Sequence, residues 1–280
     1  MSTIIRQQRR VLVFTDFDGT LLDHYTYSFE AASQCMQRLQ GLGIPIIPNT
    51  SKTFAEVKNL QVKMSLETPL IVENGAAIYM PKNFLPEKPR GAVWQNGYWI
   101  KTFAQKRIYW QGIIKKIEAN HVGQFETFGN MDLDRIMEVT GLDDDSAALA
   151  SQRQFGEPLL WKASVEDRND FIEKIKKLGA SPLLGGRFLH VCGDSNKGKA
   201  LLWLLNEYKR QHSTKIVSSI ALGDGNNDVD MLEVADTAVR ILSPVHSPPE
   251  LERTHKVYTS TKYGPDGWAE VMNQLIPDIK

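Results

Sequence analysis

Residues 11–20 carry the strongest signal in this chain and read Val-Leu-Val-Phe-Thr-Asp-Phe-Asp-Gly-Thr. The short apolar run predicts a buried strand, and two carboxylates, Asp16 and Asp18, follow it one residue apart. Side chains at i and i+2 of an extended chain point to the same side, so the two acids are expected to converge where the strand ends. Two carboxylates that close repel each other unless a cation or a proton accompanies them. The stretch therefore predicts a site for Mg²⁺, which takes hard oxygen ligands and readily shares a substrate phosphate.

A second acidic segment lies far downstream and also ends a short apolar run. Residues 217–228 read Val-Ser-Ser-Ile-Ala-Leu-Gly-Asp-Gly-Asn-Asn-Asp. Open α/β sheets build their sites at the carboxyl ends of strands, so Asp224 and Asp228 face the first two acids if the strands are neighbours in a parallel sheet. Turn chemistry explains either segment alone, because Asp-Gly is a common turn. Together they predict one acidic pocket made from two distant parts of the chain.

Composition excludes several classes of protein. Lys plus Arg and Asp plus Glu number 33 each, so the net charge of this 280-residue chain does not favour nucleic acid or an anionic membrane as a partner. The two cysteines, Cys35 and Cys192, form no metal-binding or redox pair and fit a reducing compartment. No apolar stretch approaches the length of a membrane span. We therefore expect a cytoplasmic protein, a monomer or homodimer, that binds neither nucleic acid nor membrane.

Strands and helices are expected to alternate at both ends of the chain, which is typical of an α/β fold with a parallel sheet. The expected strands cover residues 11–15, 44–48, 69–73, 76–80, 216–222 and 237–242. The expected helices cover residues 28–41, 53–61, 197–209, 226–235 and 267–275.

The middle of the chain has a different character, and prolines at 81, 86 and 89 mark the change. It is expected to hold a hairpin at 93–100, helices at 104–119, 131–139, 143–152 and 166–178, and strands at 159–163, 182–184 and 187–192. We therefore predict a core domain of residues 1–81 and 194–280, with an α+β domain of residues 82–193 inserted into it.

The two acidic motifs, in this order and spacing, resemble those of the haloacid dehalogenase (HAD) phosphatase superfamily. The resemblance implies a Rossmann-like core that carries the chemistry and a cap, inserted between the second and third motifs, that selects the substrate. A cap of sheet and helices at this position is similar to the C2 type of the Cof-like phosphatases.

The resemblance implies roles for four residues in catalysis. Asp16 is the expected nucleophile, since a carboxylate that attacks phosphorus splits one difficult step into two. Asp18 is the expected general acid and base, although a turn-forming Asp before Gly would explain it as well. Thr50 matches the residue that hydrogen-bonds the phosphoryl group, and the alternative for it and for Ser51 is a helix N-cap.

The fourth catalytic residue is a lysine. Lys197 matches the lysine that offsets charge between nucleophile and phosphate, as phosphoryl transfer requires. Lys199, in the same expected first turn of a helix, is its rival.

The second acidic motif supplies the rest of the expected Mg²⁺ site, which comprises Asp16, Asp18, Asp224 and Asp228. Asp224 would bind the metal directly, and Asp228 would hold metal-bound water and orient its neighbours. Asn227 would touch the phosphate or orient Asp16. The alternative for Asn227 and Asp228 is a helix start, where caps and acids are favoured.

Four further segments resemble the mannosyl-3-phosphoglycerate phosphatases: residues 48–53, 72–76, 185–191 and 263–268. The implied substrate carries a phosphate, a carboxylate and a sugar. Arg187 would hold the carboxylate, because a guanidinium fork suits that geometry, and the alternative is a hairpin turn with an exposed arginine. Glu73 and Asn74 would contact the sugar, although an Asn-Gly hairpin is an equal explanation. The substrate-binding residues expected in full are Thr50, Ser51, Lys52, Glu73, Asn74, Arg187, His190, Lys197, Asn227 and Lys262.

Histidines carry little signal here, since none of the six falls in a known ligand spacing and His190 is as well explained by packing in a strand. The expected reaction is the Mg²⁺-dependent hydrolysis of mannosyl-3-phosphoglycerate through an aspartyl-phosphate. The alternatives are a phosphatase of another phosphosugar, such as glucosyl-3-phosphoglycerate or a simple sugar phosphate, a phosphomutase, and a non-catalytic binding module.

Overall fold

The computed structural model describes residues 9–185, 188–212 and 216–277, and within them the chain forms two compact units. Unit 1 contains the described residues of Met1–Ser51, Gln61–Lys101 and Asn196–Lys280. Unit 2 contains Lys52–Leu60 and the described residues of Thr102–Ser195. In the described part of the chain, no helix combines the length and the apolar character that crossing a bilayer requires.

Unit 1 is built on a parallel sheet with the strand order β13-β12-β11-β1-β2. Its strands are β1 (Arg9–Thr15), β2 (Ile46–Pro48), β11 (Ile216–Gly223), β12 (Thr237–Leu242) and β13 (Val257–Tyr263). Leu12, Val13 and Phe14 are wholly buried, which explains the unbroken apolar run of β1, because parallel strands are covered on both faces. The chain leaves β1 for β2 on one side and returns much later to β11 on the other. The ends of β1 and β11 therefore form the switch point of the sheet.

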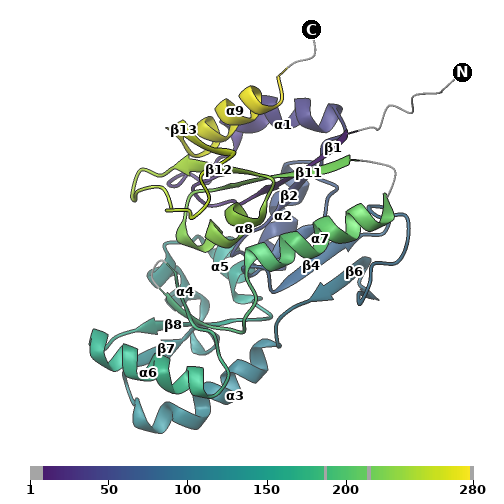
Figure 1. Ribbon diagram of the computed structural model, residues 1–280. Coiled ribbons are helices and arrows are strands. Elements are labelled where there is room, and N and C mark those ends of the chain that lie inside the picture. Colours follow the sequence, from purple (N-terminus) through teal and green to yellow (C-terminus); the bar gives the residue numbers. More distant parts are fainter. Residues whose placement is uncertain (1–8, 186–187, 213–215, 278–280) are drawn as a thin grey trace, which may run out of the picture. The chain divides into compact units, whose positions relative to one another are not determined.

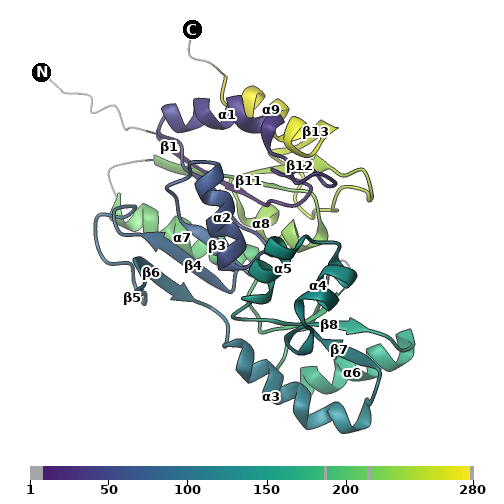
Figure 2. The same cartoon turned by 180° about the vertical axis from the view of Figure 1, so that it is seen from behind.

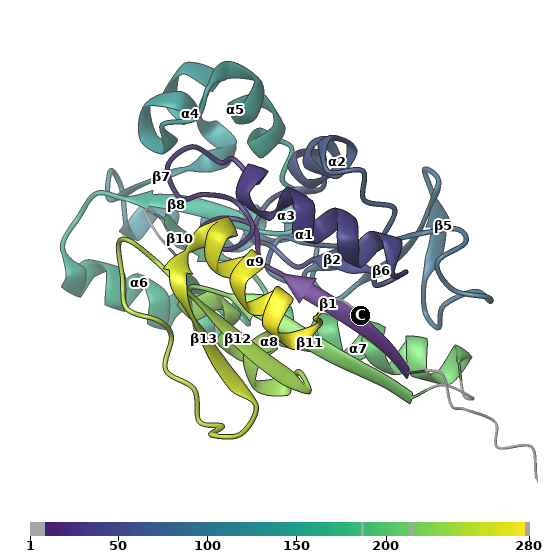
Figure 3. The same cartoon turned by 90° about the horizontal axis from the view of Figure 1, so that it is seen from above.

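Helices cover both faces of this sheet (Figures 1, 2 and 3). One face carries α1 (Glu30–Gly41) and α9 (Gly264–Leu275), and the other carries α7 (Lys197–Gln211) and α8 (Val229–Val234), which follows the 3₁₀ turn η3 (Asn226–Asp228). The expected α/β core with a parallel sheet is thus confirmed.

A second sheet of unit 1 has the order β3-β4-β6-β5. Its strands are β3 (Leu70–Val72), β4 (Ala77–Pro81), β5 (Val93–Gln95) and β6 (Tyr98–Thr102). A single bridge between Asn49 and Ile71 joins the segment after β2 to β3. Because β6 pairs with β4, residues 82–101 belong with unit 1, whereas the sequence places a domain boundary at residue 81.

Unit 2 has an α+β architecture on a sheet with the order β7-β8-β10-β9. Its strands are β7 (Phe125–Thr127), β8 (Glu157–Trp161), β9 (Leu183–Gly185) and β10 (Phe188–Val191). Its helices are α3 (Arg107–Ile117), η1 (Glu118–Asn120), η2 (Phe128–Asn130), α4 (Leu133–Thr140), α5 (Asp144–Ser151) and α6 (Val165–Lys177), and α2 (Phe54–Lys63) belongs to it in part. Leu189 and Val191 pack with α3 and α6, while Phe188 packs with α4 and α5, as the two-residue period of a strand requires.

Most expected elements form within a few residues of their expected limits, and two strands are additional. β7 has only three residues and stands between two short helices, so its apolar pattern is too brief to read. β13 lies at the edge of its sheet and most of its side chains are exposed, which removes the alternation that marks a half-buried strand. α9 begins at Gly264, before the expected residue 267, because Pro265 fits the first turn of a helix.

Trp268 of α9 connects that helix to the end of β1. Its side chain is wholly buried, and its indole Nε1–H donates to Thr15 Oγ1 over 3.1 Å. The Thr15 hydroxyl in turn donates to the backbone carbonyl of Asp16 over 2.8 Å. A tryptophan in the motif at residues 263–268 therefore positions the backbone after β1.

We expect Trp268→Phe to lower the free energy of unfolding by about 1–2 kcal/mol, because a buried hydroxyl loses its donor while most of the ring volume is kept. Trp94→Phe is the matched control, since Trp94 is 42% exposed and its replacement should change stability by less than about 0.5 kcal/mol. Urea unfolding of both variants measures the difference. Equal stability losses would contradict a specific role for the Trp268 hydrogen bond.

Candidate active site

Three buried carboxylates gather at the switch point of the unit 1 sheet. Asp16 follows β1, and its backbone N–H donates to Leu222 of β11 over 2.9 Å. Asp224 and Asp228 follow β11, and all three side chains are nearly or fully buried. Within the described residues, one carboxylate oxygen from each lies within 4.8 Å of the others. The structure thus brings together acids from two segments that are far apart in the sequence.

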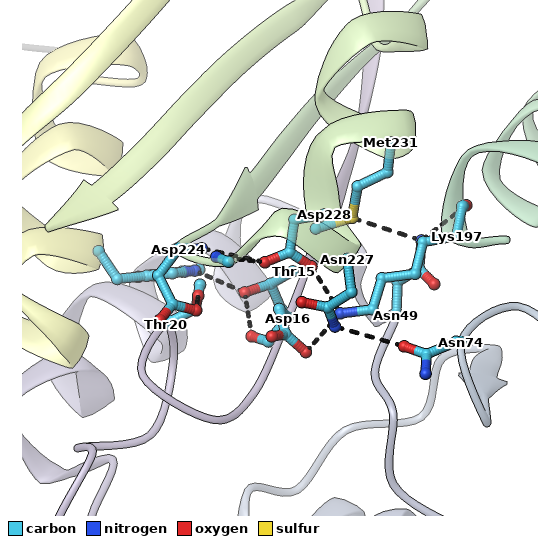
Figure 4. A network of polar contacts seen from close by, with 12 residues as sticks. Thr15, Asp16, Thr20, Asn49, Asn74, Lys197, Asp224, Asn227, Asp228 and Met231 are labelled. Atoms are coloured by element: carbon cyan, nitrogen blue, oxygen red, sulfur yellow. Dashed lines mark hydrogen bonds and ion pairs between the residues drawn. The ribbon is translucent and has the colours of Figure 1, made fainter. Parts of the chain in front are cut away.

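Lys197 contacts two of these three acids, Asp16 and Asp228 (Figure 4). Its side chain is wholly buried, and its Nζ lies 2.8 Å from Asp16 Oδ1 and 2.5 Å from Asp228 Oδ1. Burial by itself lowers the pKa of this ammonium group, but the two carboxylates raise it, and the net pKa lies above the ordinary value for lysine. Lys199 is exposed on the same helical turn, so Lys197 is the lysine that the fold directs to the acids.

Asp228 is engaged through both of its carboxylate oxygens. Oδ1 contacts Lys197, and Oδ2 accepts hydrogen bonds from the backbone N–H groups of Asp224 and Gly225, each over 3.0 Å. These contacts hold the loop between β11 and η3 in place. Such an arrangement suits a residue that orients the others.

Asp224 accepts a hydrogen bond from Thr20 and lies close to the backbone of Gly19. The Thr20 hydroxyl donates to Asp224 Oδ1 over 2.9 Å. Gly19 has φ +75°, and a Cβ on it would lie 2.5 Å from Asp224 Oδ2, so only glycine leaves this oxygen accessible. Burial, and then the charge of Asp16, raise the pKa of Asp224 to about 7. Burial also raises the pKa of Asp228, followed by the charge of Asp16.

The donor set and its charge fit Mg²⁺. Carboxylate oxygens are the hard ligands that this ion takes. When all groups are ionised, three carboxylates and one ammonium leave two negative charges in excess. The charge of Asp16 adds to the effect of burial in raising the pKa of Asp224. Asp18 is half-buried just beyond β1, and its carboxylate is not part of the group of three.

Thr50 lies beside the same end of the sheet. Asn49 N–H donates to Thr15 over 2.8 Å, which extends the pairing of β2 with β1 by one residue. Thr50 itself is wholly buried, donates its N–H to Ile71 over 3.1 Å, and accepts at its carbonyl from Asn74 N–H over 2.9 Å. Ser51 follows and is half-buried.

The turn from Glu73 to Gly75 is a strained connection between the paired strands β3 and β4. Glu73, Asn74 and Gly75 have φ values of 49°, 56° and 82°, a conformation that disfavours a residue with a Cβ. A Cβ on Gly75 would lie 2.1 Å from the Asn196 carbonyl, so the turn fits closely against the start of α7. Asn74 Oδ1 accepts a hydrogen bond from Asn227 Nδ2 over 3.3 Å (Figure 4), so two of the expected substrate-binding residues contact each other.

Four expected substrate-binding residues remain: Lys52, Arg187, His190 and Lys262. Lys52 and His190 belong to unit 2, and Arg187 lies outside the described residues. Lys52 pairs with Glu56 over 3.7 Å. Burial, together with the nearby Arg153, lowers the pKa of His190 to about 3, so this ring brings no positive charge to an anion at neutral pH. Lys262 is exposed on β13.

Three residues that the sequence analysis missed take part in the site. Asn49 is wholly buried, and its Nδ2 donates to the Lys197 carbonyl over 3.0 Å and contacts Met231 Sδ at 3.5 Å (Figure 4). Thr20 and Asn49 stand within or beside the quoted motifs, where a polar residue at a strand end is a usable signal. His246 Nε2 lies 3.3 Å from Asp224 Oδ2, and nothing in its sequence surroundings marks it.

Comparison with known proteins matches this fold and site to a family. The sequence model of one family, the haloacid dehalogenase-like hydrolases, matches residues 13–90 and 189–243 of this chain. These residues include Lys197 and all three acids of the cluster. A protein of Methanococcoides burtonii named glucosyl-3-phosphoglycerate/mannosyl-3-phosphoglycerate phosphatase is 34% identical, over 95% of this chain and 97% of the relative. A protein of the same name from Persephonella marina is 31% identical, over 96% of this chain and 98% of the relative.

A solved structure shows the same fold at lower identity. The sucrose-phosphatase of Synechocystis sp. PCC6803 superposes with a TM-score of 0.61 and 15% identity, over 95% of this chain and 98% of the other. The family match and the names of the relatives confirm the expected class of enzyme, a phosphatase. The chain belongs to the haloacid dehalogenase-like hydrolases.

Proposed function

We propose that this protein is a Mg²⁺-dependent phosphatase that hydrolyses mannosyl-3-phosphoglycerate to mannosylglycerate and phosphate. The observation that carries the proposal is the 34% identity, over nearly the whole of both chains, with a relative named for the glucosyl and mannosyl forms of this substrate. The glucosyl compound is therefore the second candidate. The buried cluster of Asp16, Asp224, Asp228 and Lys197 supports the chemistry.

In the first step, a carboxylate oxygen of Asp16 attacks phosphorus. An aspartyl-phosphate bond forms as the bond from phosphorus to the substrate oxygen breaks, and Asp18, as a carboxylic acid, gives its proton to the leaving oxygen. Lys197 holds Asp16 Oδ1 at 2.8 Å, which fixes the orientation of the nucleophile and offsets negative charge as the phosphate approaches.

In the second step, Asp18, now a carboxylate, accepts a proton from water. The water oxygen bonds to phosphorus as the aspartyl-phosphate bond breaks, which returns Asp16 to its starting form and releases inorganic phosphate. Thr50 and Asn227 would hydrogen-bond the phosphoryl oxygens in both steps.

Asp16 and Asp224 would hold Mg²⁺, with Asp228 keeping both in position through its contacts with Lys197 and the loop N–H groups. The bound ion would supply positive charge that orients the phosphate and balances the excess charge of the cluster.

Unit 2 would act as the cap that selects the substrate. Arg187 would hold the carboxylate of the substrate, and Glu73 would contact its sugar. The cytoplasmic location and the monomeric or dimeric state stay predictions.

Phosphate release from a panel of phosphorylated sugars tests the function. We expect turnover of mannosyl-3-phosphoglycerate and glucosyl-3-phosphoglycerate to exceed that of simple sugar phosphates, and to stop when a chelator removes the metal, because the cluster then keeps its excess negative charge. Adding back Mg²⁺ should restore the rate. Broad activity on simple sugar phosphates would contradict the proposed substrate but agree with a phosphatase activity. An isomerised product without free phosphate would instead favour a phosphomutase.

Asp16→Asn tests the nucleophile. We expect turnover to fall at least about a thousandfold while the protein stays folded, since an amide oxygen is a poor nucleophile of nearly the same shape. Asp134→Asn is the control, because this carboxylate is exposed on α4 of unit 2. Phosphate release and circular dichroism measure both variants, and near-normal turnover of Asp16→Asn would rule out the mechanism.

Lys197→Met tests the buried cation. We expect loss of turnover together with a fall of about 3–5 kcal/mol in the free energy of unfolding, because two buried carboxylates lose their counter-ion. Lys199→Met, two residues along the same helical turn and exposed, should leave stability within about 0.5 kcal/mol. Thermal and urea unfolding compare the two, and equal stability losses would show that the Lys197 ion pairs do not hold the site together.

A further inference from the structure

His246 borders the acidic cluster but has no part in the reaction described above. It lies in the loop between β12 and β13, within unit 1, and its side chain is 42% exposed. Its Nε2 lies 3.3 Å from Asp224 Oδ2. A histidine nitrogen therefore lies next to the carboxylate that the proposed function assigns, together with Asp16, to the metal.

The other ring nitrogen determines where the imidazole hydrogen sits. Nδ1 lies 3.1 Å from the carbonyl oxygen of Ser247. A carbonyl oxygen only accepts hydrogen bonds, so Nδ1 carries the hydrogen. Nε2 is then the ring nitrogen that faces the Asp224 carboxylate. A histidine that binds a metal through one ring nitrogen commonly donates its other N–H to a backbone carbonyl, which is the arrangement of His246 and Ser247.

The Asp224 side chain presents the matching oxygen. Thr20 occupies Oδ1 with a hydrogen bond, so Oδ2 is the oxygen turned toward the histidine. Gly19, which has no Cβ, leaves Oδ2 accessible. With metal–ligand bonds of about 2.1 Å, two neighbouring ligand atoms are about 3.0 Å apart in an octahedral site and about 3.4 Å apart in a tetrahedral one. The observed 3.3 Å between Nε2 and Oδ2 falls within this range.

The loop that carries His246 is stiffened by its sequence. Pro244, Pro248 and Pro249 restrict its backbone, and the Arg240 guanidinium donates to the Pro249 carbonyl over 3.4 Å. A restricted backbone lowers the conformational entropy that is lost when the His246 side chain takes one position beside Asp224.

We propose that His246 supplies a nitrogen ligand, through Nε2, to the divalent cation bound at Asp224. This inference rests on the metal site of the proposed function and goes beyond it, because it predicts which metals the site prefers. Imidazole suits transition metals such as Ni²⁺, Co²⁺ and Zn²⁺, whereas Mg²⁺ is held by oxygen. The site is therefore adapted to a transition metal as well as to Mg²⁺.

Calorimetric titration of the metal-free protein with Mg²⁺ and, separately, with Co²⁺ tests the proposal. For His246→Ala we expect Co²⁺ to bind at least about tenfold more weakly, while the Mg²⁺ affinity changes less than about threefold, because only the transition metal gains from a nitrogen ligand. The visible absorption of bound Co²⁺ should change in the same variant. His255→Ala is the matched control, since His255 is an exposed histidine of the same loop.

The possible outcomes separate the inference from the function on which it rests. If His246→Ala binds Co²⁺ as tightly as the wild type, or binds both metals more tightly because a positive charge has been removed, the histidine is not a ligand and the inference is overturned. Asp224→Asn should abolish binding of both metals. Unchanged binding in Asp224→Asn would instead reject the proposed metal site itself.

Discussion

The ion pairs of Lys197 with Asp16 and Asp228 are the interaction on which the site depends. A fully buried ammonium group is tolerated only with close counter-ions, and these two carboxylates are tolerated only with the ammonium. Each of the three groups comes from a different element: the end of β1, the start of α7 and the turn after β11. The pairs therefore join three segments and orient the carboxylate that attacks phosphorus in the proposed mechanism.

The parallel sheet places these groups within reach of one another. β1 and β11 are neighbours although more than half of the chain separates them, and their carboxyl ends lie at the same edge. Hydrogen bonds fix this edge: the backbone N–H groups of Asp16 and Asn49 donate to the carbonyls of Leu222 and Thr15, and the Trp268 side chain donates to the Thr15 hydroxyl. The acids thus rest on a rigid frame, which is the condition for a preorganised site.

Charge explains why the cluster is suited to a cation. Lys197 balances part of the negative charge, yet burial still raises the pKa of Asp224 to about 7. A buried carboxylate that resists ionisation gains most from a divalent ion beside it. Asp228 has a different task, because both of its oxygens are already held by Lys197 and by loop N–H groups. His246 approaches Asp224 from a loop that the parallel sheet carries to the same edge.

The sequence by itself determined the α/β class, the two acidic motifs and the choice of strands that bear them. These follow from local patterns, since an apolar run, a pair of acids and a turn are readable within a dozen residues. It favoured Lys197 but left Lys199 open as a rival, and it missed Asn49 and His246, because which side chain points inward depends on how distant segments pack. Tertiary structure decided those points, and it also kept residues 82–101 with unit 1 through the pairing of β6 with β4. The physical reason is that strand order and burial set the position and charge of a side chain, and neither is encoded in its immediate neighbours.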